Sequence, residues 1–471
     1  MLSSLSEGRG EPQSRVLRTA PNLVPRLMKL AVVLVPAIAL LRSGAAHADD
    51  GTPALAVRTM LANPAELADW LAGHDPMIES ARAHTEAAAE ASEQARVLPN
   101  PQLQAGVGGI AVGQSNQFQG MVGPTSFSQT GNFTVGIGEL VEIGKRGPRK
   151  AAADLRVREA GETAIGALGA RLGDATATLG KLAYVASKRD VVAQNLDAAR
   201  QLQALEKTRL DNKDLSALEF GRIELDTEEL ELQLGRAEAE LSSAVAACSA
   251  TLFVPCSAAG LDAAALDAGA PLPDALPEPQ KAIEDRPARQ ATKLEAEALG
   301  NDAELAHNRR IPDPTLGVSY MYDRYSYGGG LPQTLAVTIG IPLPLFDTGS
   351  HDAAAARANA RAIVAEDQAT LREARGVVEA LIAQRQTLVQ TLSKLETVEI
   401  PKSTQIISQT RKAFDLGQAR LADLLLVERA HRDLLLEVLD TRFDLFNVRA
   451  QLRQALGLDD EIARIAGRRA R

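Results

Sequence analysis

Two segments of the chain alternate between apolar and small or polar residues, the pattern of β-strands with two unlike faces. In the clearer segment, 310–349, the apolar positions are Leu316, Val318, Tyr320 and Tyr322 before a glycine-rich loop, and Leu335, Val337, Ile339 and Ile341 after it. This predicts a β-hairpin over 312–345. The flanking segments are rich in Ala, Leu, Glu and Arg and predict helices. Because a lone hairpin is barely stable in water, we expect it to join other strands or to lie in another medium.

The same pattern occurs earlier in the chain, so the sequence is internally duplicated. The motif LPNP at 98–101 matches IPDP at 311–314, and Gly147 matches Gly349 beyond the second strand of each copy. The earlier copy predicts a β-hairpin over 99–143. The resulting organisation is a first repeat, a Pro/Ala-rich linker, a second repeat and a C-terminal tail, at 49–260, 261–284, 285–458 and 459–471.

Each repeat continues from its hairpin into a long helical pattern that turns back on itself. The first helix runs from about 149 to 210 and returns over 215–247, and the second runs from 352 to 414 and returns over 421–456. The two helical hairpins have nearly equal reach, which places both helical turns at one end and both β-hairpins at the other. Four strands cannot close a barrel, so several chains would have to share one.

The N-terminal segment has the features of an export signal. Residues 28–48 contain a basic start, about a dozen apolar residues and an Ala-His-Ala cleavage site, which predicts a secretory signal peptide over 1–48 with Met28 as an alternative start. The apolar stretch is too short to span a bilayer. The rest of the sequence predicts no transmembrane helix.

Composition and candidate chemistry exclude several function classes. The net charge of −9 and the scattered basic residues argue against a nucleic-acid partner. Residues 106–113, GVGGIAVG, lack the following helix that a phosphate-binding loop requires. No nucleophile–base constellation appears, so we expect neither an enzyme nor a cofactor. The acid-rich run at 226–233 is interpreted as a solvated helix face.

The two cysteines, Cys248 and Cys256, lie eight positions apart, which leaves open a local disulfide or two free thiols. A metal site is disfavoured because the six histidines form no cluster with them.

Aromatic and acidic residues gather at the two expected ends. Tyr320, Tyr322, Tyr325 and Tyr327 lie in one strand and its loop, as in the interfacial girdle of an outer-membrane barrel, although a soluble hairpin could use them as core. At the helical turns, Asp423 and its first-half counterpart Glu219 supply one acid per repeat. If several chains form a tube, these acids form a negatively charged ring that selects cations. The alternative is a pair of lone surface acids.

Several motifs together resemble the TolC-like outer-membrane efflux channels, and within them the branch that serves cobalt–zinc–cadmium exporters. They are the duplicated strand starts, LVEIGKRG and IPLPLFDTG at the hairpin exits, AFDLGQARLADLLLVERA, and LRQALGL near the end. The resemblance implies a mainly α fold with a β-barrel part. Duplicated long α-helical hairpins would form a trimeric periplasmic tunnel, capped by a shared 12-stranded outer-membrane β-barrel with four strands per chain.

The resemblance also implies a function and partners. The protein would be a homotrimer in outer-membrane lipid, would dock a periplasmic adaptor and an inner-membrane RND pump, and would passively conduct heavy-metal cations. A drug-efflux or type I secretion channel is the first alternative. A soluble periplasmic coiled-coil scaffold or adaptor is the alternative of another class, which the two alternating hairpins disfavour.

Carried over by position, Asp423 matches the acid of the tunnel entrance. The second-half turn that meets the adaptor corresponds to Phe414, Asp415, Gly417 and Arg420, and the first-half turn contains Asp211 and Lys213. Lys213 departs from the pattern because it stands where the second half has Gly417. Leu426 occupies the position of a second entrance acid in the family.

Overall fold

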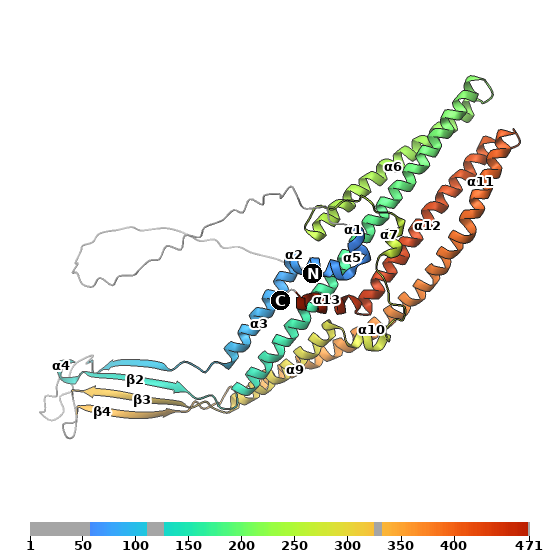
Figure 1. Ribbon diagram of the computed structural model, residues 1–471. Helices are drawn as coiled ribbons and strands as arrows, with labels where there is room; N and C mark the ends of the chain where they lie inside the picture. The colour runs from blue at the N-terminus through green and yellow to red at the C-terminus, as the bar shows by residue number, and fades with distance from the viewer. Residues whose placement is uncertain (1–56, 111–126, 325–331, 470–471) are drawn as a thin grey trace, which may run out of the picture. The chain divides into compact units, whose positions relative to one another are not determined.

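The computed structural model describes residues 57–110, 127–324 and 332–469 (Figure 1). The predicted signal peptide lies outside these ranges, and so do Tyr325 and Tyr327. All described elements belong to one compact unit, Pro53–Arg471. None of the helices in the described ranges is both long enough and apolar enough to cross a membrane.

The two β-hairpins form a single antiparallel sheet in the order β1-β2-β3-β4. The strands are β1 (Gln102–Gly108), β2 (Asn132–Leu140), β3 (Thr315–Asp323) and β4 (Gln333–Gly340). The hairpins are joined through β2 and β3, which pair from Asn132 opposite Asp323 to Leu140 opposite Thr315. The expectation that each hairpin joins other strands is thus confirmed. Within the described chain, β1 and β4 are the edges of the sheet.

The first repeat supplies a helix of unusual length. Helix α5 (Arg146–Asp211) has 66 residues, which corresponds to about 100 Å, and α6 (Ala217–Leu252) returns along it. The helix that precedes the first hairpin is α3 (Pro76–Arg96), which packs on α5. Before it lie α1 (Val57–Ala62) and α2 (Pro64–His74). The sheet and the α5–α6 turn therefore lie at opposite ends of α5, as predicted.

The second repeat has the same element order but its long helix is interrupted. Its elements are α9 (Pro287–His307), η1 (Asn308–Arg310), α10 (Ser350–Lys394), the π-helical η2 (Leu395–Glu399), α11 (Ile400–Asp415) and α12 (Leu421–Ala455). The sequence pattern predicted an uninterrupted helix over 352–414. The interruption lies next to Pro401, which has no backbone N–H for the helical hydrogen bond and crowds the preceding turn.

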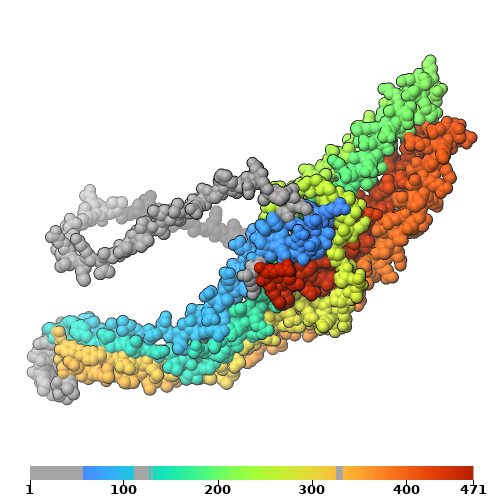
Figure 2. Space-filling model, in the orientation of Figure 1, coloured from blue at the N-terminus to red at the C-terminus, as the bar shows by residue number. Residues whose placement is uncertain are grey.

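The segments predicted as linker and tail are part of the packed structure. The linker contains α7 (Ala263–Ala268) and α8 (Pro279–Glu284), and it buries Leu266, Ala270 and Ile283. The tail is helix α13 (Leu458–Arg469), which contacts α2 and α5. Figure 2 shows this dark red helix against the blue first helices. At its start Asp459 forms a fully buried ion pair with Arg453, 2.7 Å between Nη2 and Oδ1.

The main core lies where α5 and α12 cross and depends on a small residue. Gly180 of α5 lies against the ring of Phe446, which is completely buried, and a Cβ on Gly180 would overlap that ring. The same cluster contains Leu179, Leu182 and Leu439. Glycine at this position therefore sets how closely the two helices approach.

Cys248 and Cys256 form a disulfide at the end of α6, with their Cα atoms 6.0 Å apart. Both cysteines are buried in the main core, and Trp70 of α2 donates from its indole nitrogen to the carbonyl of Leu252 at 3.1 Å. The disulfide therefore fixes the end of α6 beside the first helices.

Replacing both Cys248 and Cys256 by Ala is expected to destabilise the protein by about 2.5 kcal/mol, because the bond closes a short loop in the unfolded chain. Thermal unfolding followed by circular dichroism should show a lower midpoint than the oxidised parent. Reduction of the parent should reproduce that decrease, and reduction should leave the double variant unchanged. An unaltered midpoint in the variant would contradict the stabilising role.

Candidate functional site

One face of the sheet is apolar across all four strands and open to solvent in the single chain. Strand pairing places Val107, Phe133, Tyr322 and their equivalents on the same side. The other apolar members of this face are Leu103, Ala105, Val135, Ile137, Leu316, Val318, Tyr320, Leu335, Val337 and Ile339. Two polar residues, Glu139 near the end of β2 and Gln333 at the start of β4, lie on the same face at its margins. Val337 remains 73% exposed and Leu335 72%. A continuous apolar surface of this kind marks a contact with another molecule or with lipid.

The opposite face of the sheet carries mainly small and polar residues, with Met321 and Leu140 as apolar exceptions. It contains Gln104, Thr134, Ser319 and Thr338 together with several glycines. Such a face is compatible with water. The sheet therefore separates an apolar side from a polar side, as the alternation in sequence predicted.

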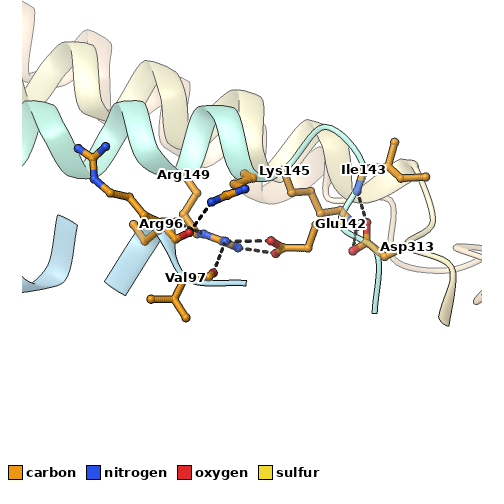
Figure 3. Close-up of polar contacts among 9 residues, drawn as sticks. Arg96, Val97, Glu142, Ile143, Lys145, Arg149 and Asp313 are labelled. Atoms are coloured by element: carbon orange, nitrogen blue, oxygen red, sulfur yellow. Dashed lines mark hydrogen bonds and ion pairs between the residues drawn. The ribbon is translucent and has the colours of Figure 1, made fainter. Parts of the chain in front are cut away.

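Arg149 of α5 joins the sheet to the helices (Figure 3). It forms a two-pronged ion pair with Glu142, which follows β2, and donates to the carbonyls of Ala95 and Val97 at 3.0 and 3.4 Å. The bond to Glu142 raises the pKa of the Arg149 side chain. A single side chain thus ties the exit of β2 to the end of α3.

The motifs LVEIGKRG and IPDP meet at the same junction. Asp313 accepts a hydrogen bond from the backbone nitrogen of Ile143 at 2.9 Å and pairs with Lys145 at 2.5 Å (Figure 3). Both ionic side chains are largely buried. The matching exit of the second repeat ends at Gly349, where φ is +68° and a Cβ would overlap the carbonyl of Ala306. These contacts explain the residue types at Asp313, Lys145 and Gly349. Gly147, which the sequence matched to Gly349, lies instead inside α5 and has no positive φ.

The first helical turn holds Glu219 as part of a helix cap. Ser216 and Glu219 form a capping box at the start of α6, with the Ser216 hydroxyl 2.7 Å from the Glu219 carboxylate. The bonds from the Ser216 side chain and backbone lower the pKa of Glu219. Asp211 and Lys213 are exposed in the preceding turn. Lys213 adopts φ of +62°, the left-handed conformation that Gly417 supplies in the second repeat.

The second helical turn holds Asp423 in the equivalent position. Its carboxylate accepts hydrogen bonds from the backbone nitrogen and guanidinium of Arg420 at 3.2–3.3 Å, and these bonds lower its pKa. Asp415 and Gly417 are exposed. Glu219 and Asp423, the two predicted entrance acids, therefore cap their own helices. The hydrogen bonds described for each carboxylate come from the N-cap residue of the same helix.

The two helical hairpins contact each other next to these turns. Phe414 is buried, and the Arg209 guanidinium of α5 lies 4.8 Å from the centre of its ring, a favourable cation–π geometry. The surrounding apolar cluster draws from both repeats; it contains Leu202, Leu215, Phe220, Ile223, Leu421 and Leu424. Phe414 is thus a packing residue between the hairpins, whereas Asp415 and Gly417 face outward.

Asp226 forms a connection between the hairpins that the sequence analysis missed. It accepts from Arg432 of α12 at 2.8 and 3.0 Å and from Arg429 at 3.4 Å, and its side chain is only 10% exposed. The interpretation of 226–233 as a solvated face was therefore wrong at Asp226. The signal was its spacing: it lies three residues after Ile223 and four before Leu230, both buried, hence on the buried side of α6.

Metal-ligand geometry is absent from the described part of the chain, which contains no group of three or more His, Cys, Asp or Glu side chains able to hold an ion.

Comparisons with known proteins agree with this architecture. Residues 279–458 match the family described as outer membrane efflux protein. No curated protein matches the chain. Among solved structures, the chain is similar to CusC (15% identity, 84% of this chain and 92% of that chain, TM-score 0.69). It is also similar to the outer-membrane channel OprN (15%, 85% and 90%, 0.70) and to the outer membrane protein VceC of Vibrio cholerae (19%, 84% and 96%, 0.67). The chain therefore has the fold of the outer-membrane efflux channels.

Proposed function

We propose that this protein is the outer-membrane channel of a tripartite efflux system of the RND type and passively conducts its cargo from the periplasm to the exterior. The observation that carries the proposal is the four-stranded sheet, which has one exposed apolar face and two free edges and stands at the end of long paired helices. The family match over 279–458 and the shared fold support it.

In the proposed assembly three chains close their sheets into one 12-stranded barrel. The apolar face, with Val337 and Val318, turns toward outer-membrane lipid, and the polar face lines the pore. Strands of seven to nine residues approach the length that a tilted membrane strand requires. Tyr320 and Tyr322 belong to the aromatic girdle at the membrane surface. The sequence assigns Tyr325 and Tyr327 to the same girdle, and both lie outside the described residues. Closure satisfies the backbone groups of β1 and β4.

The helical hairpins form the periplasmic tunnel, and their turns form its entrance. Glu219 and Asp423 place ionised carboxylates there, and three copies form rings of negative charge that favour cations. The exposed turn residues Asp211, Lys213, Asp415, Gly417 and Arg420, with Phe414 beneath them, meet the periplasmic adaptor. The pump supplies the energy, so the channel itself needs no catalytic site.

A negatively charged tunnel entrance favours cations, and the sequence motifs resemble the channels that serve cobalt–zinc–cadmium exporters. Heavy-metal cations are therefore the cargo that we assign to the channel. The same pore would also serve a drug-efflux or type I secretion system, because a conduit does not have to recognise its cargo. A soluble scaffold is the rival of another class, and the exposed apolar face argues against it.

Membrane fractionation and native mass measurement in detergent test the proposal. We expect a trimer that is found in the outer-membrane fraction and needs detergent to stay in solution. A monomer in the soluble periplasmic fraction would refute the channel and leave the scaffold. Metal sensitivity of a deletion strain, compared with its drug sensitivity, then separates the two kinds of cargo.

Cation selectivity of the channel in planar bilayers is expected to persist from pH 7 down to about pH 5. Hydrogen bonds within each turn lower the pKa values of Glu219 and Asp423, so both carboxylates are ionised throughout this pH range. The double variant Glu219→Gln, Asp423→Asn should lose most of this selectivity at every pH. Selectivity that disappears between pH 7 and 5 in the parent would contradict the assignment of these acids.

A further inference from the structure

The internal duplication preserves strand pairing residue by residue. Aligning the motif at 98–101 with that at 311–314 makes Gln102 equivalent to Thr315, and aligning Gly147 with Gly349 makes Gly138 equivalent to Gly340. Gln102 pairs with Gly138 in β1–β2, and Thr315 pairs with Gly340 in β3–β4. Replacing each residue of the β1–β2 ladder by its sequence equivalent therefore reproduces the pairs of the β3–β4 ladder, with no shift in register.

The same equivalence converts the β2–β3 ladder into a ladder that the single chain cannot form. Its two strands become β4 and β1, which are the free edges of the described sheet. Resting on the proposed trimeric channel, we infer that β4 of one copy pairs with β1 of the next in one defined antiparallel register. The observed pair of Gly136 with Ser319 becomes Thr338 with the next copy's Gly106, and that of Gly138 with Gly317 becomes Gly340 with its Gln104.

The inferred register agrees with the two faces of the sheet. It sets Val337 opposite Val107 and Ile339 opposite Ala105, so apolar residues stay on one side and small or polar residues on the other. A slip by one residue would mix the faces. The face pattern therefore excludes odd shifts, and only shifts of two residues or more remain as competitors.

The stagger of the strands distinguishes the register from those competitors. Gln102 of β1 pairs with Gly138 of β2, and Gly138 pairs with Gly317 of β3. The residue of β3 that is equivalent to Gln102 is Thr315, so moving across two strands advances the register by two residues. The inferred ladder advances by the same two residues, from Thr315 through Gly340 to Gln104 of the next copy. An even stagger of one residue per strand gives a strand tilt of about 35°, within the range for closed barrels. If the β4–β1 register were shifted by two residues, the stagger at the contact between copies would differ from the stagger between β2 and β3 within each copy.

The charges at the junction have changed in a way that fits contact between copies. Within the chain, Asp313 binds Lys145. In the sequence alignment, the residues that correspond to Asp313 and Lys145 are Asn100 and Asp347. The inferred register brings the two segments that carry them next to each other at the end of the β4–β1 ladder. A carboxylate at position 100 would face that of Asp347, whereas the amide of Asn100 can donate to it.

Cysteine crosslinking measures the register directly. In the β2–β3 ladder, Val141 donates its backbone N–H to the carbonyl of Pro314 at 2.9 Å, so these two residues form a hydrogen-bonded pair. Hydrogen-bonded and non-hydrogen-bonded pairs alternate along an antiparallel ladder, and the pair of Gly136 with Ser319 is therefore of the closer, non-hydrogen-bonded kind. The equivalents of such pairs suit a disulfide. The sites also have room, because a Cβ on Gly106 would lie 4.0 Å from Thr134 and one on Gly340 3.9 Å from Thr315.

Four double variants form a matched set in the purified full-length protein. Thr338→Cys with Gly106→Cys, and Gly340→Cys with Gln104→Cys, are expected to give covalent trimers on non-reducing denaturing gels. Thr338→Cys with Gln104→Cys, and Gly340→Cys with Gly106→Cys, use the same substitutions two residues out of register and should give at least tenfold less crosslinked product. The parent, which retains its native disulfide, should run as a monomer.

Each outcome discriminates. Native mass is measured first, and a protein that forms no trimer without the substitutions refutes the proposed function together with the register. A trimer that crosslinks mainly through the shifted pairs, or through neither set, refutes the register and leaves the channel in place. As a second measurement, Asn100→Asp should reduce the fraction of trimer, and adding Asp347→Asn should restore it. Equal trimer fractions in all three proteins would refute the contact at the junction.

Discussion

Replacing Val337 by Arg is expected to abolish assembly of the protein in the outer membrane. Val337 lies in the middle of β4 on the apolar face and is 73% exposed in the single chain. An arginine on the lipid face near the middle of the bilayer costs about 2–4 kcal/mol. Since a trimer carries three copies, the total is roughly 6–12 kcal/mol, which is comparable to the stability of a whole domain.

Thr338→Arg is the matched control, because Thr338 is the next residue of the same strand and points to the polar face. Its arginine would enter the water-filled pore, where a charge is tolerated. The amount of trimer in the outer-membrane fraction should fall at least tenfold for Val337→Arg and change little for Thr338→Arg. Equal amounts of the two variants would show that the apolar face does not contact lipid.

Replacing Asp226 by Ala is expected to loosen the two helical hairpins from each other. The substitution removes the acceptor of Arg432, whose side chain is only 12% exposed, and leaves that guanidinium without its buried partner. Loss of one member of a buried pair costs about 3–5 kcal/mol. Because the hairpins form the tunnel entrance in the proposed channel, the variant should show a conductance in planar bilayers several times that of the parent.

Glu231→Ala serves as the control for Asp226→Ala. Glu231 lies on the same helix and pairs with Arg200 of α5, but both side chains are about half exposed. Such a pair contributes less than about 1 kcal/mol, so conductance should stay at the parental value. An Asp226→Ala channel with parental conductance and unchanged thermal stability would show that the contact does not hold the entrance.

The sequence predicted those features of the fold that repeat with a short period. Alternation identified both hairpins and the apolar face, and the duplication located both long helical hairpins. It did not predict features that depend on a distant partner. The acid run around Asp226 looked solvated because its two arginines lie some 200 positions away. The segment 261–284 looked like a linker because its prolines suppress helical periodicity, although Leu266 and Ile283 are buried against other helices.

At the candidate site, too, the sequence predicted the positions of residues but not the contacts that they form. The positions of Glu219 and Asp423 at the helical turns followed from the duplication, but their roles as helix caps depend on Ser216 and Arg420 adopting N-cap geometry. The interruption at η2 was marked in the sequence by Pro401. The pattern of apolar residues continues through that proline, so periodicity alone predicts an uninterrupted helix.

The packing of α13 against α2 and α5 has a consequence for the order in which the molecule can fold. Ala463 and Ala466, close to the end of the chain, are buried in the same core as Leu67 and Leu71 near its beginning. The apolar surface of α2 therefore stays partly uncovered until the segment 458–469 has packed against it, so this part of the core closes only after distant segments of the described chain have met. A variant shortened before Leu458 would leave Leu67 and Leu71 partly open to water, an exposed apolar surface that favours aggregation.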